Sequence, residues 1–355
     1  MVSPGPVPPP TAASAPAAPS GLGSSGLGSS ALDSPALDPD GHPADDVPTS
    51  GPAMAPIRDG LELCYQTFGE RTGEPLLLVM GLGAPMTWWD ERMCRMLARR
   101  GFFVVRFDNR DTGRSSAVDA PARRSDVVRA FLGLPTRAPY TLGDMAADAV
   151  ALLDHLDLPA AHVAGISMGG MIAQRVAIDA PERVWSLASI MSTTGRRGVG
   201  WQHPSLLLPL LTDTRADRST SDADRASYVR QSVRTWRLTG SPAYRLDDDA
   251  LARRAEDTWD HGVNRAGTVR QMIAVLQAPN REPELRRLCL PTTVVHGLAD
   301  KMVHVSGGRA TAGAVPGAEL VLVEGVGHDV PLPLFGFVVD ALRRTADRAD
   351  APHPA

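Results

Sequence analysis

Short, mostly apolar runs alternate with stretches of helical periodicity from Leu61 to about residue 345, and few folds are compatible with this alternation. The run 75–80 is apolar at every position and ends at Gly81, as a strand buried on both faces does before a tight turn. Further candidate strands, each followed by a loop, lie at 102–107, 161–164, 185–190, 292–295 and 320–323. Strands separated by helices in this way predict an α/β fold with a mostly parallel sheet flanked by helices.

The strand pattern stops between about residues 195 and 280, where helical periodicity replaces it. Strands of the same sheet pattern flank this segment on both sides, so an inserted helical subdomain explains it better than a separate C-terminal domain does. We therefore expect a core made of residues 54–194 and 281–345 and a helical cap at 195–280. The apolar anchors of this cap are Trp201, Leu206–Leu211, Trp236, Trp259 and Met272.

The two ends of the chain have a different composition. Residues 1–57 contain 13 Pro and 7 Gly and no aromatic residue, which is typical of low-complexity sequence. We expect a disordered tail over residues 1–53 and a second one over 346–355. Because such a segment has too little apolar surface to offset its ordering entropy, its deletion should leave stability unchanged.

Composition also excludes several classes of function. The chain has 355 residues and a formal net charge of -4, so it has no overall basic field for binding nucleic acid or anionic lipid. No apolar run reaches the 18 to 20 residues of a membrane helix, and the three cysteines lack zinc-site or disulfide spacing. We expect a cytoplasmic protein that acts on a small molecule and binds neither nucleic acid nor a membrane; the oligomeric state stays open.

The segment Gly165-Ile166-Ser167-Met168-Gly169 lies between a candidate strand and a helical stretch. A serine hydroxyl can attack a carbonyl when it projects from a strained turn at the end of a strand. Neighbours without a Cβ atom allow the strand and the helix to approach each other there. In this context the motif predicts a nucleophile elbow with Ser167 as the nucleophile.

A serine nucleophile needs a base, and that base needs an acid that orients it. Asp300 and His328 follow the last two candidate strands, and His328 lies among small residues. The strand at 185–190 is followed by Met-Ser-Thr-Thr and supplies no carboxylate. We therefore predict a catalytic triad of Ser167, Asp300 and His328.

Other polar residues near these positions are interpreted as structural. Asp329 is expected to form hydrogen bonds within its loop, and His296 and His304 are expected to have structural roles. The run 108–111, Asp-Asn-Arg-Asp, has no third ligand at a suitable spacing for a metal ion. We expect it to be a hydrogen-bonded loop that supports the site, and we expect neither a metal nor a cofactor.

Acyl transfer also needs hydrogen-bond donors for the oxyanion, and backbone N–H groups are the usual source. The N–H of Met168, directly after the nucleophile, is one candidate. The other is the N–H of Leu82, in the turn after the first long apolar run, with Gly83 as second choice. Five tryptophans are candidates for the substrate pocket: Trp88, Trp89, Trp201, Trp236 and Trp259. Packing under the sheet is an equally good interpretation of Trp88 and Trp89, whereas we expect some of the cap tryptophans to face the cleft over Ser167.

Together these motifs resemble the α/β-hydrolase superfamily over residues 55–345. Those at 80–83, 88–89, 165–170, 296–300 and 327–329 are most similar to bacterial esterases related to aclacinomycin methylesterase. The resemblance implies an eight-stranded sheet, a cap inserted after the sixth strand, and the same triad. Many members of the superfamily have His-Gly at the oxyanion turn where this chain has Met80-Gly81, a change that leaves the backbone donors in place.

The predicted function is a cofactor-independent serine hydrolase that cleaves a carboxylic ester through an acyl-enzyme. A cap rich in apolar residues favours a substrate with a bulky apolar or aromatic acyl part. A methyl ester of such a small molecule is one example. A cofactor-free perhydrolase, a lactonase, a thioesterase or a C–C hydrolase would use the same triad. A ligand-binding protein without catalysis is the alternative from another class.

Overall fold

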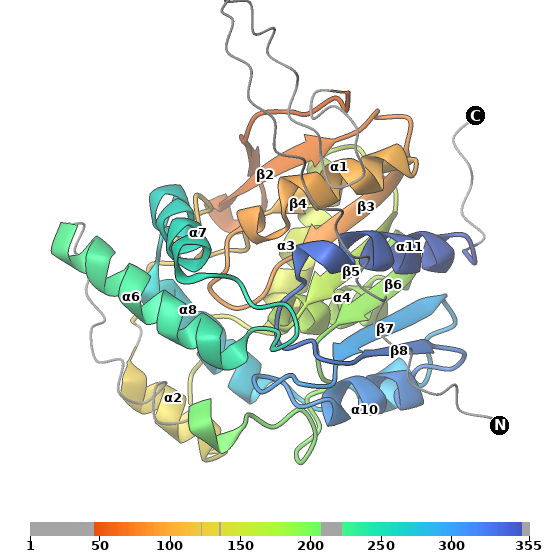
Figure 1. Cartoon of the computed structure of the whole chain (residues 1–355). Coiled ribbons are helices and arrows are strands. Elements are labelled where there is room, and N and C mark those ends of the chain that lie inside the picture. The colour runs from red at the N-terminus through yellow and green to blue at the C-terminus, as the bar shows by residue number, and fades with distance from the viewer. Residues whose placement is uncertain (1–45, 122, 135, 207–221, 350–355) are drawn as a thin grey trace, which may run out of the picture.

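The computed structural model describes residues 46–121, 123–134, 136–206 and 222–349. These residues contain an eight-stranded sheet with the strand order β1-β2-β4-β3-β5-β6-β7-β8 (Figure 1). β1 and β2 join by antiparallel pairing and the other six strands run parallel, which confirms the predicted α/β class. The strands are β1 Ala53–Pro56, β2 Glu62–Phe68, β3 Glu74–Val79, β4 Phe102–Phe107, β5 Ala161–Ile166, β6 Val184–Ile190, β7 Thr292–Gly297 and β8 Glu319–Val323.

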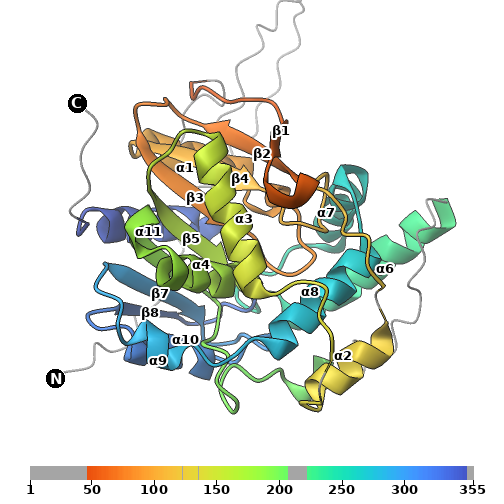
Figure 2. The same ribbon diagram turned by 180° about the vertical axis from the view of Figure 1, so that it is seen from behind.

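Helices cover both faces of the sheet (Figures 1 and 2). α1 (Glu91–Arg99) and α11 (Phe335–Ala346) pack on one face, where Leu97 and Val339 are fully or almost fully buried. The other face is covered by α3 Leu142–His155, α4 Met168–Asp179 and α10 Ser306–Ala314. Because apolar cores lie on both faces, the central strands are buried on both sides, as their mostly apolar sequences predict.

The folded part extends beyond both predicted ends of the core. Val47 is buried, the carboxylate of Asp46 pairs with the Arg99 guanidinium, and Thr49 forms a β-bridge with Phe68. At the other end Ala346 is buried, and the Arg348 guanidinium donates to the carbonyl oxygen of Thr292. The predicted tails over 1–53 and 346–355 are therefore wrong for residues 46–53 and 346–349; residues 1–45 and 350–355 lie outside the described residues.

Helices fill the interval between β6 and β7 in the part that the structure describes. The three long ones, which we call the cap helices, are α6 Asp222–Thr239, α7 Asp248–His261 and α8 Arg265–Gln277. Side chains cap two of them: Asp247 accepts from Ala250 N at the start of α7, and Asn264 accepts from Gly267 N at the start of α8. Leu206 is buried, whereas the rest of the predicted Leu206–Leu211 cluster lies outside the described residues.

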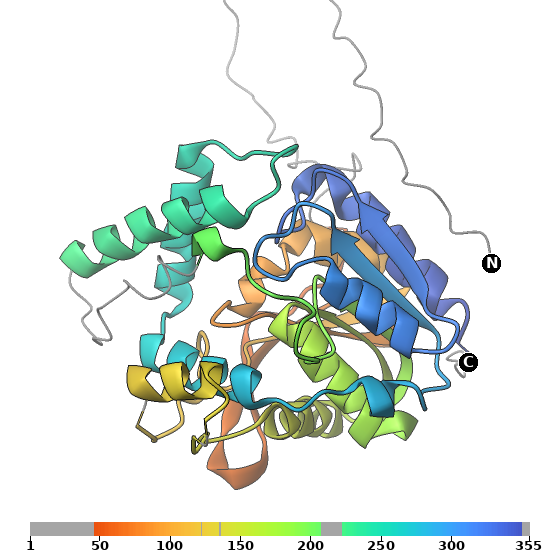
Figure 3. The same cartoon turned by 90° about the horizontal axis from the view of Figure 1, so that it is seen from below.

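The cap helices lie to one side of the sheet (Figure 3). α2 (Arg124–Phe131) joins them by packing on α8, and the short α9 (Glu282–Leu285) leads back to β7. No helix in the described residues is both long and apolar enough to cross a membrane.

Candidate active site

Ser167 lies in a sharp turn between β5 and α4. Its φ of 58° and ψ of -120° are outside the regions that L-residues normally adopt, so the turn is strained. Two hydrogen bonds hold this turn to the end of β6: Ser167 N donates to Ile190 O at 2.9 Å, and Ser192 Oγ donates to Ser167 O at 2.7 Å. Ser167 thus has the backbone geometry of a nucleophile elbow.

The glycines of the motif permit a close approach between strand and helix. A Cβ atom on Gly165 would overlap the carbonyl oxygen of Gly169, and one on Gly169 would overlap the carbonyl oxygen of Val79 in β3. A Cβ on Gly81, in the turn after β3, would lie 3.2 Å from the Ser167 Cβ. Glycine is therefore needed at these positions because of the close contacts around the serine, and not because the backbone must be flexible there.

Gly169→Ala should disrupt this packing. The new methyl group meets backbone atoms that cannot rotate away, so we expect a loss of about 3 kcal/mol or more in the free energy of unfolding, together with loss of activity. Gly143→Ala is the matched control, because its Cβ would meet only the Thr141 hydroxyl at 3.4 Å and the residue lies in a helix. It should be neutral or stabilising by up to about 1 kcal/mol. Urea unfolding measures both, and equal effects of the two variants would contradict the argument.

Asp300 and His328 follow β7 and β8, and the structure brings their side chains together. His328 Nδ1 and Asp300 Oδ2 are 2.8 Å apart. The other carboxylate oxygen, Oδ1, accepts from the backbone N–H groups of Met302 at 2.8 Å and Val303 at 2.9 Å. These backbone bonds hold the carboxylate so that Oδ2 faces the imidazole. Because β5 to β8 are adjacent parallel strands, Ser167 lies at the same edge of the sheet as this pair.

Asp300 and His328 each stabilise the charged form of the other. Burial opposes ionisation of Asp300, but the charge of His328 and hydrogen bonds from two histidines outweigh it and lower the pKa of Asp300 to about 2. Burial alone would lower the pKa of His328, yet the Asp300 charge and hydrogen bond raise it above its ordinary value. Asp300 is therefore a stable carboxylate that supports a positive charge on His328.

His296, interpreted from the sequence as structural, also touches the acid. Its side chain is buried, its Nε2 lies 2.8 Å from Val303 O and 3.4 Å from Asp300 Oδ2. The bond to a carbonyl places the proton on Nε2, so His296 directs an N–H toward Asp300. His304 instead stacks on Trp201, with ring centroids 4.3 Å apart.

The turn after β3 presents backbone donors beside the elbow. Gly83 N donates to the side chain of Gln271 in α8 at 2.8 Å, so this N–H is already used. The N–H of Leu82 is therefore the better candidate for the second oxyanion donor, beside that of Met168. Asn109 Nδ2 donates to Met80 O at 2.9 Å and supports the same turn. Gln271 could not have been identified from the sequence, because it lies 188 residues from Gly83.

The run 108–111 is a hydrogen-bonded loop, as expected. Asp108 accepts from Met86 N and Arg114 N and lies 2.7 Å from Nε2 of His261 in α7. Asp111 pairs with Arg270 of α8 through both carboxylate oxygens. The loop thus joins the core to two cap helices. No cluster of three or more potential metal ligands occurs among the residues that the structure describes.

The five candidate pocket tryptophans lie in different environments. Trp89 is 1% exposed and belongs to the core beside α1, so its assignment to the pocket is corrected. Trp259 packs on Tyr228 between α6 and α7, and Trp201 is 47% exposed. Trp88 and Trp236 contact each other, with ring centroids 4.8 Å apart.

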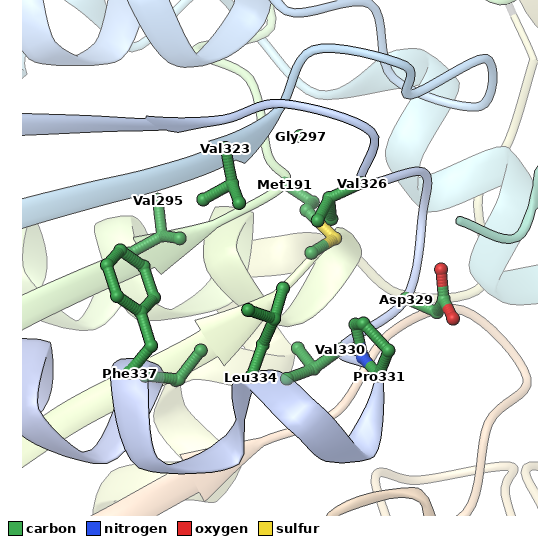
Figure 4. Close-up of a pocket in the computed structure, with 11 residues that line it drawn as sticks. Met191, Val295, Gly297, Val323, Val326, Asp329, Val330, Pro331, Leu334 and Phe337 are labelled. Carbon is green, nitrogen blue, oxygen red and sulfur yellow. The ribbon is translucent and has the colours of Figure 1, made fainter. Parts of the chain in front are cut away.

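Two hollows in the protein do not coincide with the site. One is an apolar cavity of about 10 Å³ beneath the loop after β8, too small and too apolar for a substrate. The Asp329 carboxylate at its margin points away from the apolar lining (Figure 4) and accepts from the Ser241 hydroxyl in the cap region at 2.6 Å. A larger hollow of about 310 Å³ is lined mainly by residues of β2, such as Tyr65 and Thr67, and of the segments beside it.

Comparisons with known proteins agree with this architecture. The family described as the alpha/beta hydrolase fold matches residues 74–333. The chain is 30% identical to rhodomycin D methylesterase DnrP of Streptomyces peucetius over 300 residues, 79% of this chain and 93% of that protein. It is 26% identical to 3-oxoadipate enol-lactonase 2 of Acinetobacter baylyi over 249 residues, 70% of this chain and 79% of that protein.

A solved structure shows the same fold. The enol-lactonase from Burkholderia xenovorans LB400 has a TM-score of 0.60 and 22% identity, over 83% of this chain and 98% of that one. The chain has an eight-stranded, mostly parallel sheet, a strained serine after β5 and an Asp–His pair after β7 and β8. The family model matches most of the same chain, so the protein belongs to the α/β-hydrolase family.

Proposed function

We propose that the protein is a carboxylic ester hydrolase with Ser167 as nucleophile, His328 as general base and Asp300 as the acid that orients it. The observation that carries this proposal is the 2.8 Å contact between Asp300 and His328 at the sheet edge that holds the strained Ser167. The similarity to rhodomycin D methylesterase supports ester hydrolysis as the reaction. No step of this reaction requires a cofactor or a metal ion.

In this mechanism Ser167 Oγ attacks the ester carbonyl while His328 Nε2 removes the hydroxyl proton. The N–H groups of Leu82 and Met168 donate to the oxyanion, and Asp300 stabilises the imidazolium through Nδ1–H. His328 then protonates the departing alcohol, and the C–O bond to it breaks. Water, deprotonated by His328, attacks the acyl-enzyme and releases the carboxylic acid with Ser167 restored.

The proposed substrate is a methyl ester with a bulky apolar or aromatic acyl part. The cap helices meet the core beside the proposed oxyanion turn through Gln271 and beside the base through Thr239, whose carbonyl accepts from His328 N at 2.8 Å. Aromatic side chains lie at the same junction, where Trp88 and Trp236 meet. An acyl group held there would lie against indole rings.

A lactonase is the second candidate, because 3-oxoadipate enol-lactonase 2 is among the relatives and a lactone is a cyclic ester opened by the same steps. Thioester and peracid chemistry would use the same residues, and so would C–C bond hydrolysis. If Ser167 is not an unusually reactive nucleophile, the protein binds a ligand without catalysing a reaction.

A fluorophosphonate probe tests the nucleophile directly. We expect labelling at Ser167, located by mass spectrometry of the intact, folded protein, and none after heat denaturation. A panel of methyl esters, p-nitrophenyl esters, lactones and thioesters then identifies the substrate class through kcat/KM. Labelling at another serine, or no labelling of folded protein, would reject the proposed mechanism.

The pH profile should show the titration of His328. Only the neutral imidazole can accept the Ser167 proton, and the pKa of His328 is raised above its ordinary value of about 6.5. Activity should therefore be complete above this raised pKa and lost as the pH falls through it, with the acid limb of kcat/KM above pH about 6.5. A profile measured with one methyl ester checks this, and an acid limb well below pH 6 would contradict the assignment.

A further inference from the structure

Three side chains meet where the cap joins the core, and we call them the Arg254 cluster: Trp88, Trp236 and Arg254. The Arg254 guanidinium carbon lies 5.0 Å from the ring centroid of Trp88 and 4.6 Å from that of Trp236. The two indoles are tilted by 46° to each other. Each contact falls within the range in which a cation is attracted to an indole ring.

The cluster is held in place by hydrogen bonds. Trp88 Nε1 donates to Thr258 Oγ1 at 2.9 Å, and the Thr258 hydroxyl donates to Arg254 O at 2.7 Å, one turn back in α7. Thr258 thus fixes the Trp88 side chain from the core against the turn of α7 that carries Arg254. The indole of Trp88, fixed by this bond, in turn contacts the Arg254 guanidinium.

The Arg254 guanidinium has no hydrogen-bond acceptor, and no carboxylate within 4.0 Å, among the residues that the structure describes. Two carboxylates in its neighbourhood are engaged elsewhere. Asp90 binds the Arg92 guanidinium through both oxygens, and Asp329 accepts from the Ser241 hydroxyl. Burial lowers the pKa of Arg254, and only the more distant charges of Asp329 and Asp90 oppose that effect.

The buried arginines of this protein have acceptors, unlike the half-buried Arg254. Arg110 binds both oxygens of Asp148, and Arg270 binds both oxygens of Asp111. Because an arginine withdrawn from water is costly without acceptors, such pairing is the ordinary arrangement. Arg254 is only half-buried and lies against indole rings, which accept no strong hydrogen bond, so its donors are open to water or to a ligand.

The cluster lies beside the proposed catalytic groups. Trp88 follows the turn that holds Leu82, and Trp236 lies one turn before Thr239, whose carbonyl oxygen binds His328 N. Gly240, which donates to Trp236 O, is close enough that its Cβ would lie 4.0 Å from Asp329 Oδ1. The segment that follows Trp236 therefore contacts the loop that carries His328, which is the reason for assigning a group bound at the cluster to the substrate.

We propose that the Arg254 cluster is a substrate subsite that binds a carboxylate on the acyl part of the ester, with Trp88 and Trp236 contacting the carbon skeleton next to it. A planar carboxylate can accept two parallel hydrogen bonds from a guanidinium, an arrangement of high specificity. The substrate class is then a half-ester of an aromatic or otherwise flat dicarboxylic acid. This inference rests on the proposed ester hydrolysis for its place in the reaction.

The test compares two substrates that differ only in charge at one group. Monomethyl terephthalate carries a carboxylate, and methyl 4-nitrobenzoate carries a neutral nitro group of the same shape. We expect Arg254→Met to lower kcat/KM for monomethyl terephthalate by about 10- to 100-fold and to change that for the nitro ester by less than about 3-fold. The difference in intrinsic reactivity between the two esters cancels when each variant is compared with the unmodified protein.

Arg253→Met is the matched control, because it removes an exposed positive charge one residue away on the same helix. It should leave the ratio of the two kcat/KM values unchanged. Arg254→Lys should keep part of the preference, since a lysine retains the charge without the planar fork. Equal losses for both esters in Arg254→Met, or an equal shift in Arg253→Met, would overturn the subsite.

A binding experiment separates this inference from the proposed function. Ser167→Ala and the double variant Ser167→Ala/Arg254→Met are titrated with both esters by calorimetry. We expect Ser167→Ala to bind the carboxylate ester at least about 10-fold more tightly than the nitro ester, and the double variant to lose that difference. Absence of any preference in Ser167→Ala overturns the subsite, whereas a preference without ester hydrolysis by the unmodified protein overturns only the esterase assignment.

Discussion

Ser167→Ala is expected to lower kcat for ester hydrolysis by on the order of 10⁵- to 10⁶-fold, because nucleophile, base and acid act as a unit. The residual rate would come from the oxyanion donors and from substrate binding. The fold should remain intact, because the hydrogen bonds that hold the elbow use Ser167 N and Ser167 O and not its hydroxyl. Single-turnover measurements of ester cleavage, with circular dichroism and melting temperature on the same samples, check both statements.

Ser205→Ala is the control for this measurement. Ser205 is exposed, and among the described residues its hydroxyl bonds to the nearby His203 ring. Its replacement should leave kcat and the melting temperature unchanged. Turnover of Ser167→Ala within a factor of about ten of the unmodified protein would show that another nucleophile carries the reaction.

The central part of the fold could be predicted because its strands are buried on both faces and are therefore mostly apolar. β4, for example, was predicted with the bounds that the structure has, Phe102–Phe107. β1 and β2 carry no such signal: they pair antiparallel at one edge of the sheet, and β2 mixes buried with half-buried positions. The Pro-rich composition before residue 57 also concealed β1 and the contacts of residues 46–53.

The residues of the candidate site also form two groups, one that the sequence could predict and one that it could not. Ser167, Asp300 and His328 each follow a strand, so the order of strands in the sequence was enough to propose them. His261, Gln271 and Arg254 come from the cap helices, and their partners in the core are remote in sequence: 153 residues separate Asp108 from His261. No local pattern indicates such contacts, because they depend on how the cap packs on the core. The proposed substrate subsite is therefore the part of the candidate site that needed the structure.

Asp300→Asn is expected to lower kcat by on the order of 10⁴-fold through the tautomer of His328. Oδ1 of Asp300 accepts from Met302 N and Val303 N, so the amide oxygen of asparagine should take that position and the NH₂ group should face His328 Nδ1. His328 Nδ1 must then accept a hydrogen bond, which places the ring proton on Nε2. An imidazole with a proton on Nε2 cannot remove the proton of Ser167.

The pH profile distinguishes this explanation from simple misfolding. The charge that raises the pKa of His328 is lost in Asp300→Asn, so the acid limb of kcat/KM should move to lower pH while the plateau falls. Asp329→Asn is the matched control: Asp329 also raises the pKa of His328, but its carboxylate binds Ser241 and not the imidazole, so the plateau should fall far less. A mild Asp300→Asn variant beside an inactive Asp329→Asn or Asp108→Asn variant would mean that the acid of the triad is one of those two residues.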